Sequence, residues 1–178
     1  MRTFRLFLAL PLIALYLAAQ PAMPRKAPEL TIVEPGGKQT LLSSYRGKVV
    51  ALAFIFTTCS HCQAECGVLN KLNTELGPKG FQALAVAFND NAGMLVSAFT
   101  QTFHTNFPVG FAARQTVTDY MQLDDTGKVA WVVPQLALID RKGMIVAQSA
   151  PEGSLDLQEE APLRKKIVDL LAAHKTGH

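Results

Sequence analysis

Two long apolar runs dominate the pattern of hydrophobic and polar positions along the chain. Residues 49–56 are all apolar, and residues 81–88 contain a single polar position. Runs of this length without polar alternation are typical of strands buried on both faces of a sheet. Residues 63–76 between them carry leucines at helical spacing, and glycine and proline residues in 77–80 end the helix. The pattern predicts a βαβ unit with two parallel, neighbouring strands.

Shorter periodic segments flank this unit. Two short strand segments at 30–33 and 40–42 enclose a Gly-rich turn, which predicts a hairpin, and residues 43–48 are expected to be a loop. The remaining predicted segments are helices at about 92–104, 117–123 and 155–173, a short extended piece near 106–110, and strands at 135–140 and 144–148. The sequence thus predicts an α/β fold with a central mixed β-sheet flanked by helices, an N-terminal β-hairpin extension and an inserted helix.

The N-terminal residues have the pattern of a targeting segment. Arg2 and Arg5 precede an apolar run over residues 6–19, and a polar, Pro-rich stretch follows. This is typical of a secretory signal peptide, and the run is shorter than a bilayer span. A strict Ala-x-Ala cleavage signal is missing, so a retained membrane anchor stays open, with the protein exported to the periplasm or another extracytoplasmic space in either case. The expected organisation is a signal peptide or N-terminal anchor at 1–22, a linker at 23–29 and one domain at 30–178.

Composition and charge exclude some classes of function. The chain has 178 residues, of which 49% are hydrophobic and 17% charged, and this suits one globular domain. The net charge is +3, and the lysines and arginines are scattered rather than gathered into a stripe that could follow a phosphate backbone. Binding to nucleic acid is therefore not expected.

Three cysteines, Cys59, Cys62 and Cys66, lie within eight residues. A disulfide framework spreads its cysteines along the chain, whereas this clustering suits a redox or metal centre. A zinc site is not expected, because three clustered cysteines and His61 cannot easily surround one ion from a single helical turn. We interpret the cluster as a redox centre that needs neither a metal nor another cofactor.

Cys59 and Cys62 fall at the start of the predicted helix. Unpaired N–H groups and the positive end of the helix dipole stabilise a thiolate there, so Cys59 is the expected nucleophile. Cys62, about one turn further on, is expected to close a disulfide with Cys59 and release the substrate. Ser60 and His61 are expected to tune this exchange, with an imidazolium at His61 making the disulfide more oxidising. The alternative is that His61 is a solvated helix-end residue without redox influence.

The segment VVALAFIFTTCSHC, residues 49–62, resembles the second core strand and active site of the TlpA/ResA-like branch of the thioredoxin superfamily. Residues 41–48 resemble the lead-in of that branch, and residues 133–143 resemble its cis-proline strand and turn. The likeness extends from about residue 27 to the C-terminal helix. It implies a thioredoxin-like fold and an enzyme that exchanges disulfides with cysteine-containing protein substrates and with a redox partner that the sequence does not identify.

The resemblance also implies roles for single residues. Pro134 is expected to be a cis-proline, and Val133 to face the active site and pair its backbone with an extended substrate segment. Glu65 matches an active-site glutamate that helps proton transfer, although a bare helix glutamate is more often exposed. The chain departs from thioredoxins at Thr58, where they usually have Trp, and at Ala53, where they have a buried acid. Thr58 is either a hydroxyl near the first cysteine that tunes it or a plain loop residue.

Cys66 lies four residues after Cys62, and helix geometry seldom lets such a pair close an unstrained disulfide. A cysteine in this position is most often a small buried hydrophobe. We therefore expect Cys66 to be buried, with an auxiliary redox role as the alternative.

Two other functions fit the sequence less well. A Sco-type copper-binding or copper-delivery protein shares the fold, and thiolates with imidazole suit copper. Such sites use Cys-x-x-x-Cys with a distant His, whereas the gap here is two residues and the remote histidines are His104, His174 and His178. A thiol peroxidase needs a Pro-x-x-x-Thr/Ser-x-x-Cys loop, and no proline closely precedes Cys59. Both reduction and oxidation of the substrate stay open.

Overall fold

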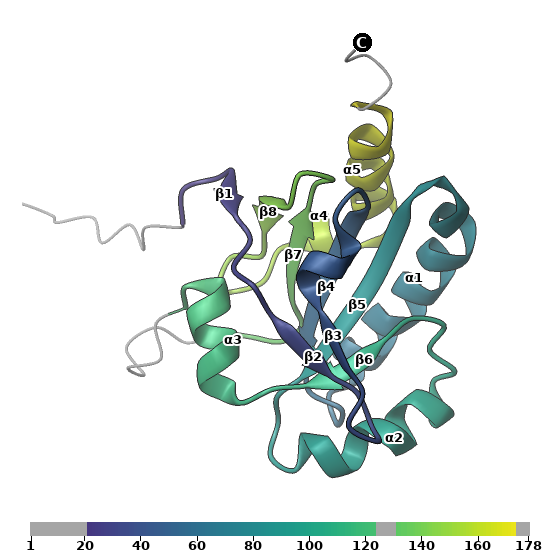
Figure 1. The fold of residues 1–178 in the computed structure, drawn as a ribbon, viewed down its shortest axis with the longest axis vertical. Coiled ribbons are helices and arrows are strands. Elements are labelled where there is room, and N and C mark those ends of the chain that lie inside the picture. The colour runs from purple at the N-terminus through teal and green to yellow at the C-terminus, as the bar shows by residue number, and fades with distance from the viewer. Residues whose placement is uncertain (1–20, 124–130, 174–178) are drawn as a thin grey trace, which may run out of the picture.

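The described residues form an α/β fold built around a mixed sheet of eight strands (Figure 1). The computed structural model describes residues 21–123 and 131–173. Residues 1–20, on which the export prediction depends, lie outside the described part. Among the residues that are described, no helix is both long enough and apolar enough to span a bilayer. The architecture confirms the predicted fold class.

The strands are β1 (Arg25–Lys26), β2 (Thr31–Val33), β3 (Gln39–Leu41), β4 (Val49–Ile55), β5 (Phe81–Ala87), β6 (Val109–Phe111), β7 (Gln135–Ile139) and β8 (Met144–Gln148). Their order in the sheet is β1-β8-β7-β4-β5-β6-β2-β3. β4 pairs in parallel with β5, and β5 with β6, whereas β4 and β7 are antiparallel. The predicted parallel neighbours are confirmed, and the predicted N-terminal hairpin is β2–β3, beside β6.

The helices are α1 (Ser60–Leu76), α2 (Ala92–Thr102), α3 (Arg114–Met121), α4 (Leu155–Gln158) and α5 (Glu160–Ala172). Buried side chains of α1, α2, α4 and α5 join one core cluster, and those of α3 join the other. Figure 1 shows α3 on the opposite side of the sheet from α1. The domain therefore has helices on both faces of the sheet.

The central strand β4 divides the core in two. Its odd-numbered positions, 49–55, pack into the cluster that contains α1, and its even-numbered positions, 50–54, pack into the cluster that contains α3. This follows from the alternation of side chains across a pleated strand. All seven positions are buried, which confirms a strand covered on both faces.

The sequence predicts a single closing helix over 155–173, and the structure has two helices there instead. The segment is divided into α4 and α5 at Glu159, whose ψ of 137° is extended. Pro162 explains the division, because proline has no N–H to donate to the carbonyl four residues earlier and its ring clashes with that carbonyl. In one uninterrupted helix that carbonyl would belong to Gln158. Helix α4 therefore ends at Gln158, and α5 begins at Glu160.

Three smaller differences concern segment ends. Residues 42–45 form a 3₁₀ turn, which takes in the end of the predicted strand segment 40–42 and the start of the expected loop 43–48, and α3 begins at Arg114 rather than at residue 117. Within the stretch 23–29 that we expected to be a linker, Arg25–Lys26 forms β1 and pairs with β8, and Ala27 is buried. This stretch is too short and too polar to show a strand period in the sequence.

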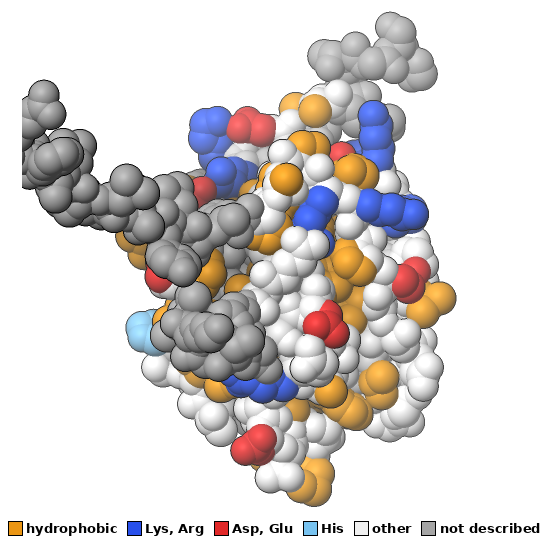
Figure 2. Space-filling view, turned by 90° about the vertical axis from the view of Figure 1, so that its left-hand side faces the viewer, with side chains coloured by type: hydrophobic (Ala, Val, Ile, Leu, Met, Phe, Trp, Pro, Cys, Tyr) orange, Lys and Arg blue, Asp and Glu red, His pale blue; other side chains and the backbone are white. Residues whose placement is uncertain are grey.

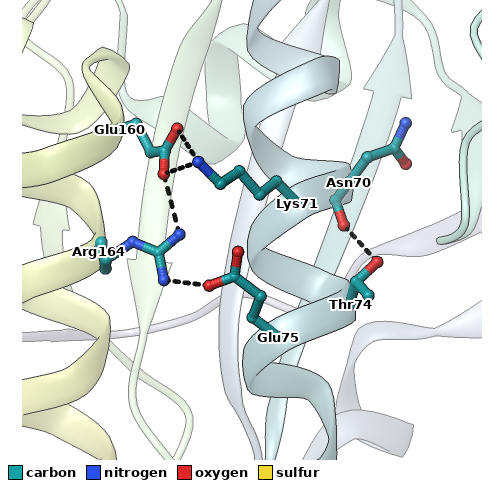
Figure 3. Close-up of polar contacts among 6 residues, drawn as sticks. All are labelled: Asn70, Lys71, Thr74, Glu75, Glu160 and Arg164. Atoms are coloured by element: carbon teal, nitrogen blue, oxygen red, sulfur yellow. Dashed lines mark hydrogen bonds and ion pairs between the residues drawn. The ribbon is translucent and has the colours of Figure 1, made fainter.

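Ion pairs join α1 to α5 (Figure 3). Glu160 forms an ion pair with Lys71 at 2.8 Å and accepts a hydrogen bond from Arg164 at 2.9 Å, and Arg164 also pairs with Glu75. The hydrogen bond from Arg164 lowers the pKa of the Glu75 carboxyl, and those from Lys71 and Arg164 lower the pKa of Glu160. The helix that begins at the cysteines is thus tied to the C-terminal helix at its far end.

Candidate functional site

The cysteines lie where the carboxyl ends of β4 and β5 meet the beginning of β7. The loop 56–59 leaves β4 and leads directly into α1, for which Cys59 is the N-cap residue. The Val133–Pro134 peptide bond, which is cis, comes just before β7. Since β7 runs antiparallel to β4, both segments reach the same edge of the sheet.

Cys59 is half-buried and its backbone is extended, with φ −89° and ψ 122°. Its carbonyl accepts the first helical hydrogen bond, from the Gln63 N–H at 3.0 Å. Its Sγ lies 3.9 Å from the carbonyl oxygen of Val133. Unpaired N–H groups of the first turn and the dipole of a 17-residue helix act at this position, and the first turn holds no acidic residue.

Cys62 is fully buried one turn along α1. Burial raises the pKa of its thiol above the ordinary range, and the Phe56 N–H, 3.4 Å from Sγ, opposes that rise. The structure holds Cys59, Cys62 and Cys66 as free thiols. One sulfur of the pair is therefore accessible and the other is enclosed by the fold.

The loop that carries Cys59 is fixed by two residues that sequence reasoning missed. Asn89, at the end of β5, accepts hydrogen bonds from the Thr57 N–H at 2.8 Å and from its hydroxyl at 3.2 Å. Gln63 Nε2 donates to the Thr57 carbonyl at 3.0 Å. The only signal for Asn89 in the sequence is a polar residue directly after a buried strand.

The three residues expected to tune the pair, Thr58, Ser60 and His61, are all exposed. His61 lies at the edge of a groove of about 490 Å³ that runs along α1. The groove is bounded by α1, by residues 132–134 and by α4, and its rim carries two exposed apolar side chains, Val132 and Leu155.

Glu65 lines this groove from α1 and is only 3% exposed. Its Oε1 atom has no hydrogen-bond partner among the described residues. Burial raises the pKa of its carboxyl to about 8. The buried position differs from that of an ordinary surface helix glutamate, and at pH 7 the group is mostly neutral.

Cys66 is fully buried in the core cluster that contains α1. Burial raises the pKa of its thiol to about 12. It thus has the position expected of a small buried hydrophobe.

Aromatic side chains from the ends of β4 and β5 pack together with Trp131, which precedes β7. Phe56 meets Phe88 edge-on with ring centroids 4.7 Å apart, and Phe88 stacks on Trp131 at 5.6 Å. The Arg114 guanidinium lies over the Trp131 ring at 4.5 Å. This cluster fixes the loops that leave β4 and β5 and the segment that enters β7.

Within residues 21–123 and 131–173, no group of three or more His, Cys, Asp or Glu residues is arranged to hold a metal ion. The His104 carbonyl is bonded by the side chain of Asn70, which is 11 positions after Cys59. At 1.5 Å per residue this separation along α1 is about 16 Å. His174 and His178 lie outside the described residues. His104, the one remote histidine among the described residues, is thus far from Cys59.

Comparison with known proteins identifies relatives that are described as thiol-disulfide oxidoreductases. A family profile described as Redoxin matches residues 23–167. The chain is 25% identical over 141 residues to the thiol-disulfide oxidoreductase ResA of Bacillus thuringiensis subsp. konkukian, which spans 76% of this chain and 74% of the relative. It is 28% identical over 119 residues to ResA of Geobacillus kaustophilus, which spans 67% of this chain and 64% of that relative.

Solved structures of similar fold agree with these relatives. A protein from Chlorobium tepidum, described as a thiol:disulfide interchange protein DsbE, superposes with a TM-score of 0.67 at 25% identity, over 83% of this chain and 96% of its own. A protein from Bacteroides thetaiotaomicron, described as a disulfide isomerase, gives a TM-score of 0.70 at 28% identity, over 88% of this chain and 96% of its own.

Proposed function

The chain belongs to the Redoxin family and is a thiol–disulfide oxidoreductase of the thioredoxin fold, and on this premise we propose that it is exported and exchanges disulfides with cysteine-containing protein substrates through Cys59 and Cys62. The TlpA/ResA resemblance found in the sequence is confirmed by the ResA relatives. The observation that carries the proposal is the pairing of an accessible thiol at a helix N-terminus with an enclosed thiol one turn later.

The reaction needs two exchange steps. The Cys59 thiolate attacks one sulfur of a substrate disulfide, forms a mixed disulfide with it and releases the other sulfur as a thiolate, which takes up a proton. The Cys62 sulfur, once deprotonated, attacks the Cys59 sulfur, closes the Cys59–Cys62 disulfide and releases the second substrate thiolate. Two electrons pass from the cysteine pair to the substrate, and the same steps in reverse oxidise a substrate dithiol.

The different solvent exposure of the two thiols gives each its proposed role. Cys59 is half-buried and lies at the positive end of α1, so it is the nucleophile that meets the substrate. Cys62 is enclosed and bonded by the Phe56 N–H, so it does not meet the substrate directly and reacts with the Cys59 sulfur of the mixed disulfide. Thr58, Ser60 and His61 are exposed around the first sulfur, where their hydroxyl and imidazole groups tune the thiolate.

Glu65 is proposed to move the proton of the resolving step. Cys62 must lose a proton that burial holds firmly, and a neighbouring base lowers that barrier. Glu65 follows Cys62 by three residues on the buried face of α1, lines the groove, and has a pKa near 8, which suits proton exchange near neutral pH.

Val133 and Pro134 are proposed to bind the substrate backbone. The Val133 carbonyl lies against the Cys59 sulfur, and Pro134 is buried behind it at the start of β7. An extended substrate segment that pairs with Val133 as an added strand would bring its own cysteine to Cys59. Alternate side chains of that segment would face the groove.

Export is proposed from the basic residues Arg2 and Arg5 and the apolar run 6–19 that follows. An extracytoplasmic location, periplasmic in a bacterium with an outer membrane, suits a protein that forms disulfides. Fusion of residues 1–29 to an alkaline phosphatase that is active only outside the cytoplasm tests this part. Phosphatase activity supports export, and its absence overturns it.

Trapping of the mixed disulfide tests the cysteine roles. With insulin as the disulfide probe, Cys62→Ser is expected to accumulate a covalent adduct through Cys59, seen by non-reducing intact-mass analysis, whereas Cys59→Ser forms none. Cys66→Ala is the matched control, because it removes a third thiol from the same helix, and it is expected to reduce insulin at the wild-type rate. An adduct on Cys59→Ser, or turnover by Cys62→Ser without an adduct, contradicts the assignment.

A glutathione redox titration of the Cys59–Cys62 pair tests the tuning by His61. A potential well above thioredoxin's value of about −270 mV is expected, and His61→Ala is expected to lower it. A potential equal to thioredoxin's, unchanged in the variant, rules out an influence of His61.

A further inference from the structure

Residues 131–134, here called the strap, pass Cys59 just before β7 begins. The Val133 carbonyl faces the Cys59 sulfur at 3.9 Å. The carbonyls on either side of it, those of Val132 and Pro134, are bonded by side chains rather than by neighbouring strands. The position of the strap therefore depends on the two side chains that reach these carbonyls.

Gln135 provides the first of these hydrogen bonds from within the core. It is fully buried, and its Nε2 donates to the Val132 carbonyl at 2.8 Å and lies 3.2 and 3.3 Å from the carbonyls of Ala150 and Pro151. Its Oε1 is buried without a hydrogen-bond partner in the described part of the chain. An unpartnered buried oxygen costs free energy. The amide keeps this orientation because only its NH₂ end can bond carbonyls, so the residue acts to join two loops.

Gln158 provides the second hydrogen bond from α4. Its Nε2 donates to the Pro134 carbonyl at 2.9 Å. The short helix is anchored by Leu157, which is 2% exposed, so Gln158 extends from a fixed base. The division of the closing helix at Glu159 places α4 beside the strap and leaves α5 to pack on α1.

The backbone polar groups of Val133 have fewer partners than those of its two neighbours. In residues 21–123 and 131–173, its N–H donates to no acceptor, and its carbonyl meets only the Cys59 sulfur. Pro134 has no N–H, and the Val132 N–H is already bonded to the Pro151 carbonyl at 2.9 Å. Among residues 132–134, Val133 is therefore the one that presents both an N–H and a C=O, the pair that one added strand residue can bond.

We propose that Gln135 and Gln158 are positioning residues that hold the strap so that Val133 presents both of its backbone polar groups to a polypeptide substrate beside Cys59. This rests on the proposed function and deepens it, because it assigns the selection of polypeptide disulfides over small disulfides to two glutamines that do not touch the substrate. A strap displaced by a fraction of an ångström still leaves the Cys59 sulfur reactive, but it misaligns a paired substrate segment.

The test compares two disulfide probes in single turnover with the reduced full chain. Insulin can pair with the strap, whereas 5,5′-dithiobis(2-nitrobenzoic acid) is too small to do so, and both take two electrons from the Cys59–Cys62 dithiol. Gln135→Met and Gln158→Met keep the side-chain length and lose the hydrogen bonds. Each is expected to lower the ratio of the insulin rate constant to the small-disulfide rate constant about fivefold. Gln101→Met, on the exposed face of α2, makes the same chemical change away from the strap and is expected to keep the wild-type ratio.

The outcomes separate this proposal from the proposed function. If the wild type reduces both probes and the two variants keep its ratio, the positioning role is overturned while the oxidoreductase assignment stands. If the wild type reduces neither probe, the proposed function itself fails. If Gln135→Met does not fold, Gln158→Met, which changes a partly exposed residue, decides the question alone. A general loss of structure would expose the buried Cys66 thiol to the small disulfide, so three thiols rather than two would react with it. A lowered ratio with two thiols titrated supports the proposal, and a lowered ratio with three counts against it.

Discussion

At the scale of single residues, three ionisable groups share the buried face of α1. Cys62, Glu65 and Cys66 are each nearly inaccessible, and burial raises the pKa of all three. The cause is the same in each case, because a low-dielectric surrounding disfavours the charged form. The face is therefore largely neutral at pH 7, and of the three groups Glu65 titrates closest to neutral pH.

The buried carboxyl of Glu65 is expected to make the free energy of unfolding decrease as the pH rises. Its folded pKa, about 8, is above the value of 4.5 expected in the unfolded chain. Between these pH values the folded state binds more protons than the unfolded state, so the free energy of unfolding decreases with pH. The loss of stability is absent below about pH 4 and complete above about pH 9, and it amounts to at most about 5 kcal/mol. Glu65→Gln is expected to remove this slope, as measured by urea unfolding at pH 5, 7 and 9.

The matched control is Glu75→Gln on the same helix. Its carboxyl is exposed and its pKa is lowered by Arg164, so this variant is expected to keep the decrease between pH 5 and 9. An equal slope in wild type and Glu65→Gln would show that Glu65 ionises normally in the folded protein.

At the scale of elements, the pattern of apolar and polar residues predicts the strands and helices that local interactions form. The unit β4–α1–β5 follows from two apolar runs and one helical period, and Cys59 follows from its place before the helix. Hydrogen bonds between side chains and backbone groups far apart in the sequence produce no pattern of this kind. The Thr57–Asn89 contact spans 32 residues, and the Gln158–Pro134 contact spans 24, so neither shows in the periodicity of its segment. The sequence consequently predicts the cysteines but not the side chains that hold their surroundings.

Asn89 links β5 to the loop of β4, and its removal tests that link. Asn89→Ala is expected to leave the Thr57 N–H, in a residue 7% exposed, without a partner. An unmade buried hydrogen bond costs about 1–3 kcal/mol, or roughly 2–10 °C in Tm for a domain of this size. Amide hydrogen exchange at Thr57 is expected to accelerate more than exchange in the middle of β5.

Asp90→Ala provides the control for this variant. The Asp90 side chain is exposed, and its backbone carbonyl, which accepts from Asn89, is retained in alanine. Exchange at Thr57 should then match the wild type. Acceleration in both variants would mean that the whole turn after β5, rather than the Asn89 side chain, holds the cysteine loop.

At the scale of the whole molecule, the lysines and arginines are scattered along the chain, and the net charge is +3. On the face shown in Figure 2, basic and acidic side chains are scattered among apolar and uncharged ones. A surface of this kind gives little long-range steering of a charged partner. Under the proposed function, recognition of the substrate is therefore expected to depend on short-range contacts at the strap and the groove.

The ion pairs between α1 and α5 contribute at this scale, because they join the helix of the cysteines to the end of the chain (Figure 3). Arg164→Met breaks two contacts at once, with Glu75 and Glu160. The pairs are partly exposed, so Tm is expected to fall by only a few degrees, and the difference from wild type should shrink in 1 M salt, where the Debye length is about 3 Å. Differential scanning calorimetry at 0.05 M and 1 M salt measures both.

Lys165→Met is the control on the same helix, because its pair with Asp169 lies within α5 and touches no other element. It breaks one exposed ion pair without separating α5 from α1, so a smaller decrease in Tm is expected. If the two variants lose equal Tm, the contacts with α1 add nothing to the stability of the domain. A larger, salt-sensitive loss in Arg164→Met alone shows that the C-terminal helix stabilises the helix of the cysteines electrostatically, in addition to the packing of Leu163 and Ile167 in the shared core.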